Sequence, residues 1–133
     1  VVELIQPRCK HAGIALTCDL PPNDVRILGD PGQISDIFSN LIGNAVDAVG
    51  TEGSVQVTLR HEANHAIVEV SDTGTGPTPE LAARLFEPFV TGKTEGIGLG
   101  LAVAKHAAEA HGGTIAWQRE KGRTVFRVTL RSE

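Results

Sequence analysis

The chain has 133 residues, of which 41% are hydrophobic and 21% are charged, and its formal net charge is −4. These values fit one globular domain with its own core, and the negative charge argues against a nucleic acid or an anionic membrane as partner. No apolar run is long enough to span a membrane, and no signal-peptide pattern occurs. We therefore expect a cytoplasmic domain. Cys9 and Cys18 lack CxxC spacing and are predicted to be reduced packing residues.

The first part of the chain predicts a helix and two short strands. Residues 1–13 have the spacing of an amphipathic helix, which begins abruptly, as in a domain excised from a longer protein. Residues 14–20 alternate in polarity and predict a strand that ends before Pro21-Pro22. Residues 25–28 predict a second short strand.

The clearest element is a helix over residues 31–49, with Asp30 as its N-cap and Pro31 as its first residue. Its apolar residues recur every three or four positions and predict one buried stripe. The other side of the helix carries four polar residues at similar steps: Asp36, Asn40, Asn44 and Asp47.

Two hairpins and two further helices follow. Alternating polarity predicts strands at 54–62, 65–72, 114–120 and 123–131. The strands pair around two-residue turns at Ala63-Asn64 and Lys121-Gly122. We expect helices at 80–86 and 97–111, the second ended by Gly112-Gly113. This order predicts an α/β sandwich, with one mostly antiparallel sheet and helices on one face.

The stretch around residues 90–106 contains two patterns that come close to known phosphate-binding motifs without matching either. A P-loop needs a glycine five residues before Gly92, where the chain has Glu87. A Rossmann fingerprint needs GxGxxG, whereas Gly96, Gly98 and Gly100 give GxGxG. Three glycines leading into a helix still leave N–H groups uncovered, so the segment either binds an anion or packs as a tight loop.

Two other motifs also leave alternatives open. Asp72 ends a predicted strand before a glycine-rich loop. Its carboxylate either accepts a hydrogen bond from an exocyclic amine, such as that of adenine, or stabilises its own turn. Asn40 and Asn44 lie one turn apart on a helix. Their amide oxygens either bind a hard cation such as Mg²⁺ or cap a neighbouring loop.

Taken together, four motifs resemble the N, G1, F and G2 boxes of the ATP-binding GHKL superfamily. They are NLIGNAVDA (40–48), DTGTGP (72–77), LFEPFV (85–90) and GIGLGLAVAKHAAEAHGG (96–113). The chain is most similar to the catalytic and ATP-binding domain of two-component sensor histidine kinases, in particular the nitrogen-regulation type with a short lid. The resemblance covers essentially the whole chain, which we expect to be one domain over 1–133. It implies the Bergerat fold, with a mixed, mostly antiparallel sheet and ATP bound between the sheet and its helices.

The resemblance also implies roles for the residues around the base and the metal. Asp72 would accept a hydrogen bond from the adenine N6 amine, and Gly74 and Gly76 would let the backbone pass close to the base. Asn44 would coordinate the Mg²⁺ that bridges the phosphates. Asn40 would lie one turn earlier, near the phosphates or the metal shell.

At the phosphate end, the resemblance implies a glycine-rich cradle and a mobile lid over residues 77–96. The cradle would consist of Gly96, Gly98, Leu99 and Gly100. Lys93 in the lid would either reach the γ-phosphate or remain a solvated loop lysine. Phe86 and Phe89 would either anchor the lid in the core or dock onto the acceptor domain.

The residue at position 40 favours kinase over hydrolase chemistry. Gyrase-type and chaperone members of the superfamily place a glutamate base four residues before the metal-binding asparagine, and an amide such as that of Asn40 cannot take a proton. The sequence therefore favours phosphoryl transfer to a histidine, which depends mainly on positioning and charge neutralisation. An ATP-gated dimerisation clamp would need the missing glutamate, and a degenerate nucleotide-binding signalling module is the alternative to a kinase.

The resemblance places the acceptor histidine on a separate dimerisation hairpin before Val1, and a response regulator receiver domain downstream in the phosphorelay. The sequence "HEANHA" at His61 begins like an acceptor motif but has Ala66 where the motif has proline. Many sensor kinases carry a basic residue where this chain has Asp47. Lys93 or an arginine of the hairpin domain would have to compensate for it.

Overall fold

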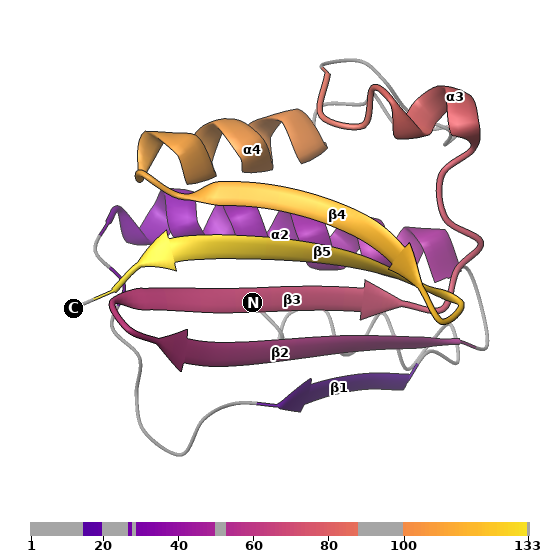
Figure 1. The fold of residues 1–133 in the computed structure, drawn as a ribbon, viewed down its shortest axis with the longest axis horizontal. Coiled ribbons are helices and arrows are strands. Elements are labelled where there is room, and N and C mark those ends of the chain that lie inside the picture. Colours follow the sequence, from indigo (N-terminus) through magenta and orange to yellow (C-terminus); the bar gives the residue numbers. More distant parts are fainter. Residues whose placement is uncertain (1–14, 20–26, 28, 50–52, 88–99, 133) are drawn as a thin grey trace.

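The computed structural model describes residues 15–19, 27, 29–49, 53–87 and 100–132. Five strands form one sheet: β1 (Ala15–Asp19), β2 (Ser54–Glu62), β3 (His65–Asp72), β4 (Thr114–Glu120) and β5 (Arg123–Arg131). Their order across the sheet is β1-β2-β3-β5-β4 (Figure 1). Strand β1 pairs in parallel with β2, and all the other pairs are antiparallel. The predicted mixed, mostly antiparallel sheet is therefore confirmed.

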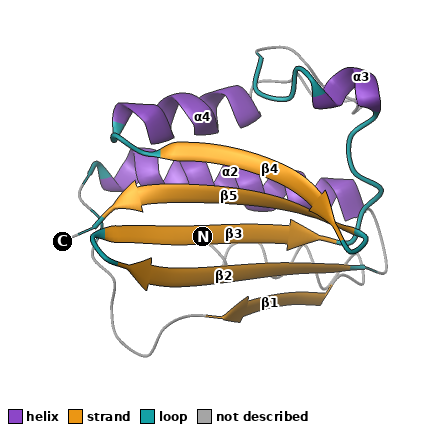
Figure 2. Cartoon of the chain, viewed as in Figure 1, coloured by secondary structure: helices purple, strands orange, loops and turns teal. Residues whose placement is uncertain are grey.

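Two long helices cover one face of this sheet (Figure 2). Helix α2 (Pro31–Val49) packs on β2 and β3, and α4 (Gly100–Ala110) packs on β4 and β5 and against α2. The core between the layers joins Ile37 and Leu41 of α2 to Val70 and Phe126 of the sheet, all at most 2% exposed. The α/β sandwich with its helices on one face is confirmed. No helix in the described ranges is long and apolar enough to cross a bilayer.

Helix α2 has the predicted bounds and the predicted cap. The Oδ1 atom of Asp30 accepts hydrogen bonds from the backbone N–H of Gly32 at 2.8 Å and of Gln33 at 3.3 Å. These bonds satisfy two of the N–H groups that lack an acceptor inside the first turn.

Both predicted hairpins are present with their two-residue turns. Ala63 has a φ of 52° in the first turn, and Lys121 and Gly122 have φ values of 49° and 75° in the second. Two successive positive φ values are typical of the type I′ turn, which matches the twist of the flanking strands.

The predicted helix over 80–86 is shorter in the structure, where α3 comprises only Pro79–Ala82. Beyond it the chain continues as turns, in which the N–H groups of Arg84 and Glu87 donate to the carbonyls of Leu81 and Arg84. These turns bring Phe86 onto the core, where its ring meets that of Phe126 edge-on. Tertiary packing therefore ends the helix earlier than its sequence pattern predicts.

Two predicted elements lie wholly or largely outside the described residues. The helix over 1–13 is outside them, and of the predicted strand at 25–28 only Ile27 is described, in an isolated antiparallel bridge with Ser132. The predicted helix over 97–111 is described from Gly100 onward and ends at Ala110. Beyond that end, Gly112 has a φ of 69° and the N–H of Gly113 donates to the carbonyl of Ala108, as in a glycine cap.

One histidine joins the start of α2 to the end of α4. The Nε2 atom of His111 accepts from the backbone N–H of Asp30 at 3.0 Å, and Nδ1 lies 2.8 Å from the Ala107 carbonyl. Because Nε2 accepts, Nδ1 carries the proton and donates it, so the imidazole is neutral. This bridge fixes the relative position of two antiparallel helices.

Replacement of the capping carboxylate tests this arrangement. We expect Asp30→Ala to lower the free energy of unfolding by about 1 kcal/mol, because Gly32 and Gln33 lose their acceptor. Asp30→Asn keeps an acceptor oxygen and should lose less than half as much in urea denaturation. An equal loss in both variants would contradict the capping role.

Candidate functional site

Asp72 is the one buried carboxylate of the described residues, with only 1% of its surface exposed. It ends β3 on the face where Val68 and Val70 pack against the helices. Its Oδ1 atom accepts from the backbone N–H of Gly74 at 2.9 Å. Its Oδ2 atom is equally buried and has no hydrogen-bond partner within the described part of the chain. A buried acceptor without a donor is costly, so this oxygen fits a ligand that brings a donor.

Burial also raises the pKa of Asp72 above its ordinary value of 3.8. Desolvation of the charged form is the largest cause. The Gly74 hydrogen bond and the positive charges of Arg119 and Arg123 lower the pKa in part, without cancelling that effect. The site therefore holds a carboxylate whose charge is poorly compensated by the protein itself.

The loop after Asp72 is closely packed at both of its glycines. A Cβ atom on Gly74 would lie 2.6 Å from the carbonyl oxygen of Ala48, near the end of α2. Gly76 has a φ of 81°, and a Cβ atom there would lie 2.9 Å from Cδ of Arg119. Both glycines are therefore required by the protein's own packing, whatever their role toward a base.

Arg119 and Thr124 belong to this site, although no sequence motif indicates either of them. The Nη1 atom of Arg119 donates to the Gly74 carbonyl at 2.6 Å and to Oγ1 of Thr124 at 2.8 Å. Asp72 pairs with Thr124 and Thr124 with Arg119, so the three residues form one row across β3, β5 and β4. The alternating polarity of β4 indicates which of its side chains face the helices. The row itself could not be predicted, because it depends on the order of the strands in the sheet, which local sequence patterns do not determine.

Asn40 and Asn44 lie one turn apart on α2, the helix whose end packs against the Asp72 loop. Both are half-buried, and Oδ1 of Asn40 lies 3.2 Å from the place that a Cβ atom on Gly100 would take. Asn40 therefore meets the start of α4, while Ala48, one turn beyond Asn44, meets Gly74. The polar face of α2 thus connects the Asp72 loop with the first turn of α4.

The described residues contain no cluster of three or more His, Cys, Asp or Glu side chains that could hold a metal ion. A metal at this site would depend on the amide oxygen of Asn44 and on oxygens of the ligand, as suits Mg²⁺. Four of the predicted phosphate-site residues lie outside the described part of the chain: Lys93, Gly96, Gly98 and Leu99.

Phe86 is anchored in the core. Its ring is perpendicular to that of Phe126, at 6.2 Å between centroids, and Nζ of Lys105 lies 5.4 Å from the centroid of Phe86. Of the two predicted roles, Phe86 therefore has the contacts of an anchor in the core. Phe89 lies outside the described residues.

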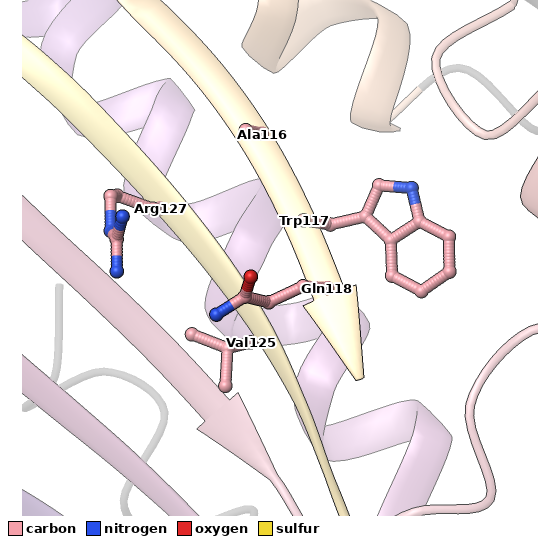
Figure 3. A pocket seen from close by; sticks show the side chains of 5 residues that line it. All are labelled: Ala116, Trp117, Gln118, Val125 and Arg127. Atoms are coloured by element: carbon pink, nitrogen blue, oxygen red, sulfur yellow. The ribbon is translucent and has the colours of Figure 1, made fainter. Parts of the chain in front are cut away.

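A shallow hollow over β4 and β5 lies apart from this site (Figure 3). Its lining residues are Ala116, Trp117, Gln118, Val125 and Arg127. Gln118, Val125 and Arg127 alternate along their strands with inward-facing residues, so the hollow belongs to the face opposite the helices. It is not the cavity in which Asp72 would act.

A family model described as "Histidine kinase-, DNA gyrase B-, and HSP90-like ATPase" matches residues 29–133. The chain belongs to this family. The matched residues include the buried Asp72, the two asparagines of α2 and the start of α4, so the family relationship covers the whole candidate site.

Curated relatives of the chain include a sensor protein and a sensory histidine kinase. It is 36% identical to the C4-dicarboxylate transport sensor protein DctB of Rhizobium meliloti over 98% of its own length and 22% of that protein. It is also 36% identical to the sensory histidine kinase/phosphatase NtrB of Rhodobacter capsulatus, over 84% of its length and 34% of that protein. The chain thus spans about a third or less of these relatives.

Solved structures agree with this assignment. The catalytic domain of the histidine kinase ThkA has a TM-score of 0.89 at 28% identity, over 97% of this chain and 86% of that one. ShkA, solved in complex with AMPPNP, has a TM-score of 0.84 at 33% identity, over 98% of this chain and 28% of that one. A complex of ThkA with the response regulator TrrA matches at 25% identity with a TM-score of 0.84, over 98% of this chain and 38% of that one. The expected GHKL family and Bergerat fold are confirmed, and the fold is that of histidine kinase catalytic domains.

The raised pKa of Asp72 gives a prediction for stability. As the pH rises above 3.8, the unfolded chain loses this proton before the folded chain does, so ionisation favours unfolding. We expect Asp72→Asn to raise the free energy of unfolding at neutral pH, because the amide carries no charge for burial to penalise.

This gain should shrink as the pH falls from the raised pKa to 3.8 and vanish below 3.8, where the carboxyl of the wild type is neutral in both states. Urea denaturation across this range measures it, with Asp36→Asn on the exposed side of α2 as the control. A gain independent of pH, or a less stable Asp72→Asn variant, would contradict the electrostatic account.

Proposed function

We propose that this chain binds Mg-ATP and donates its γ-phosphate to a histidine on a separate dimerisation hairpin domain, as the first step of two-component phosphorelay signalling. The observation that carries the proposal is the buried Oδ2 atom of Asp72, which has no hydrogen-bond donor among the described residues. The loop after Asp72 lies at one end of the polar face of α2. The other end of that face meets the start of α4 at Gly100. From Ala48 to Asn40, α2 spans about 12 Å, a length that suits an extended nucleotide.

Asp72 would bind the adenine. As a carboxylate, its Oδ2 atom only accepts hydrogen bonds, and the exocyclic amine of adenine supplies a donor. Because the oxygen is buried, this hydrogen bond would be made away from bulk water, where a mismatched base leaves the acceptor unpaired. The hydrogen bond from Gly74 to Oδ1 holds the carboxylate in position for this contact.

The phosphates would lie at the first turn of α4. Its first N–H groups have no acceptor inside the helix, and the helix dipole favours negative charge there. Asn40 lies beside this turn, and Asn44, one turn further along α2, would lie between it and the base. Bound Mg²⁺ would neutralise phosphate charge, with the amide oxygen of Asn44 as a ligand. Lys93, Gly96, Gly98 and Leu99 are proposed to complete the phosphate site.

Transfer to a protein side chain suits these residues better than hydrolysis. The amide of Asn40 cannot take a proton from water, so it can orient a phosphate but cannot act as a general base. The nucleophile would come from the acceptor-histidine domain, and a response regulator receiver domain would take the phosphoryl group next. The AMPPNP complex of ShkA supports the nucleotide, and the ThkA–TrrA complex supports the response regulator. We place this reaction in the cytoplasm, with residues 1–133 acting as one catalytic domain.

Calorimetric titration with a non-hydrolysable ATP analogue, with and without Mg²⁺, tests the proposal. We expect the wild-type chain to bind, and Asp72→Asn to bind about 100-fold more weakly, because the amide offers a donor to the adenine amine. Asn44→Ala should retain binding but lose its dependence on Mg²⁺. Asn64→Ala, in the exposed turn between β2 and β3, is the matched control.

Two results would contradict the proposed function. One is a folded wild-type chain that binds no nucleotide, and the other is an Asp72→Asn variant that binds as tightly as the wild type. Binding without phosphotransfer to the acceptor domain would leave the chain as a degenerate nucleotide-binding signalling module.

A further inference from the structure

The guanidinium of Arg119 holds both neighbours of the buried carboxylate. One of its nitrogens, Nη1, donates to the carbonyl of Gly74 and to the hydroxyl of Thr124. Gly74 in turn donates its N–H to Oδ1 of Asp72, and Thr124 pairs with Asp72 in the sheet. Arg119 therefore holds both the residue that donates to Oδ1 of Asp72 and the residue that pairs with Asp72 in the sheet.

The stem of Arg119 is seated against the loop. A Cβ atom on Gly76 would lie 2.9 Å from Cδ and 3.2 Å from Nε of Arg119, so the absence of a side chain at Gly76 makes room for the arginine. Thr124 is only 3% exposed, which places its hydrogen bond from Arg119 at the inner surface of the sheet. The contact is thus part of a packed arrangement, although much of Arg119 is exposed.

The hydrogen bond from Arg119 determines how the hydroxyl of Thr124 can act. A hydroxyl has one proton and two lone pairs, and here a lone pair accepts from the arginine. Oδ2 of Asp72 has no partner among the described residues, so the proton of Thr124 is not donated to it. The proton remains available to a ligand. An acceptor at Asp72 and a donor at Thr124 thus lie side by side.

The acceptor at Asp72 and the donor at Thr124 complement the hydrogen-bonding edge of adenine but not that of guanine. Adenine presents an amine donor beside a ring-nitrogen acceptor, whereas guanine presents a carbonyl acceptor beside an N–H donor. Without the arginine, the Thr124 hydroxyl would lose the hydrogen bond that fixes its orientation, and the Gly74 carbonyl would lose its donor, so both ligand groups would be held less well.

We propose that Arg119 is a positioning residue that determines base specificity by making the Thr124 hydroxyl a donor and holding the Gly74 loop beside Asp72. The inference rests on the proposed function, because it assigns the base-binding end of the same nucleotide site. Arg119 acts through Thr124 and Gly74 and not on the reacting phosphate.

Arg123 offers a matched control in the same hairpin. It is also close enough to lower the pKa of Asp72, but its side chain donates to the hydroxyls of Ser71 at 3.3 Å and Ser54 at 3.2 Å. It alternates with Thr124 along β5 and so lies on the opposite face of the sheet. Arg123→Gln therefore removes a nearby charge without touching the Gly74 loop or Thr124.

Calorimetric titrations with the Mg²⁺ complexes of non-hydrolysable ATP and GTP analogues test the inference in the 133-residue chain. We expect Arg119→Gln to weaken ATP-analogue binding about tenfold while leaving GTP-analogue binding nearly unchanged, so that the affinity ratio falls about tenfold. Arg119→Lys should recover part of the ratio, because the ammonium also donates, and Arg123→Gln should keep the wild-type ratio. Circular dichroism verifies that each variant is folded.

A folded Arg119→Gln variant with the wild-type ATP-to-GTP ratio would overturn the inference and leave the proposed function intact. So would Arg123→Gln lowering the ratio as much as Arg119→Gln, since charge alone would then explain the effect. A wild-type chain that binds neither analogue would overturn the proposed function, and this inference with it.

Discussion

The hydrogen bond between Oδ1 of Asp72 and the backbone N–H of Gly74 is the contact around which the site is arranged. It holds one carboxylate oxygen, while the other is buried without a partner in the described part of the chain. Strand β3 places this acid at the end of a row of buried valines, and the loop must pass against Ala48 of α2 to make the bond. The apolar core of the sandwich thus supports a group that by itself disfavours folding.

The second constraint is the relative position of α2 and α4. The neutral imidazole of His111 joins the start of α2 to the end of α4, and Asn40 meets the opposite end of α4 at Gly100. A shift of either helix would separate Asn40 from the first turn of α4. The distance between the proposed base and phosphate subsites would therefore be set by how these two helices pack against each other.

Much of this arrangement could be predicted from local sequence. The Asp30 cap, the stripe of α2 and both two-residue turns are short-range features, and the box motifs placed Asp72, Asn40 and Asn44 on the correct elements. Arg119 could not be predicted, because its contacts depend on β5 lying between β3 and β4. The early end of α3 depends on Phe86 packing against Phe126, which is also non-local. The roles of Lys93, Gly96, Gly98 and Leu99 remain predictions.

The central claim is that Oδ2 of Asp72 accepts a hydrogen bond from adenine. Carbon-13 NMR of the Asp72 side-chain carboxyl, followed as a function of pH with and without a saturating ATP analogue, tests it most directly. The account predicts a raised pKa in the free chain and a lower pKa with nucleotide bound, because a new hydrogen bond stabilises the charged form. An identical titration curve in the presence of bound nucleotide would contradict the account.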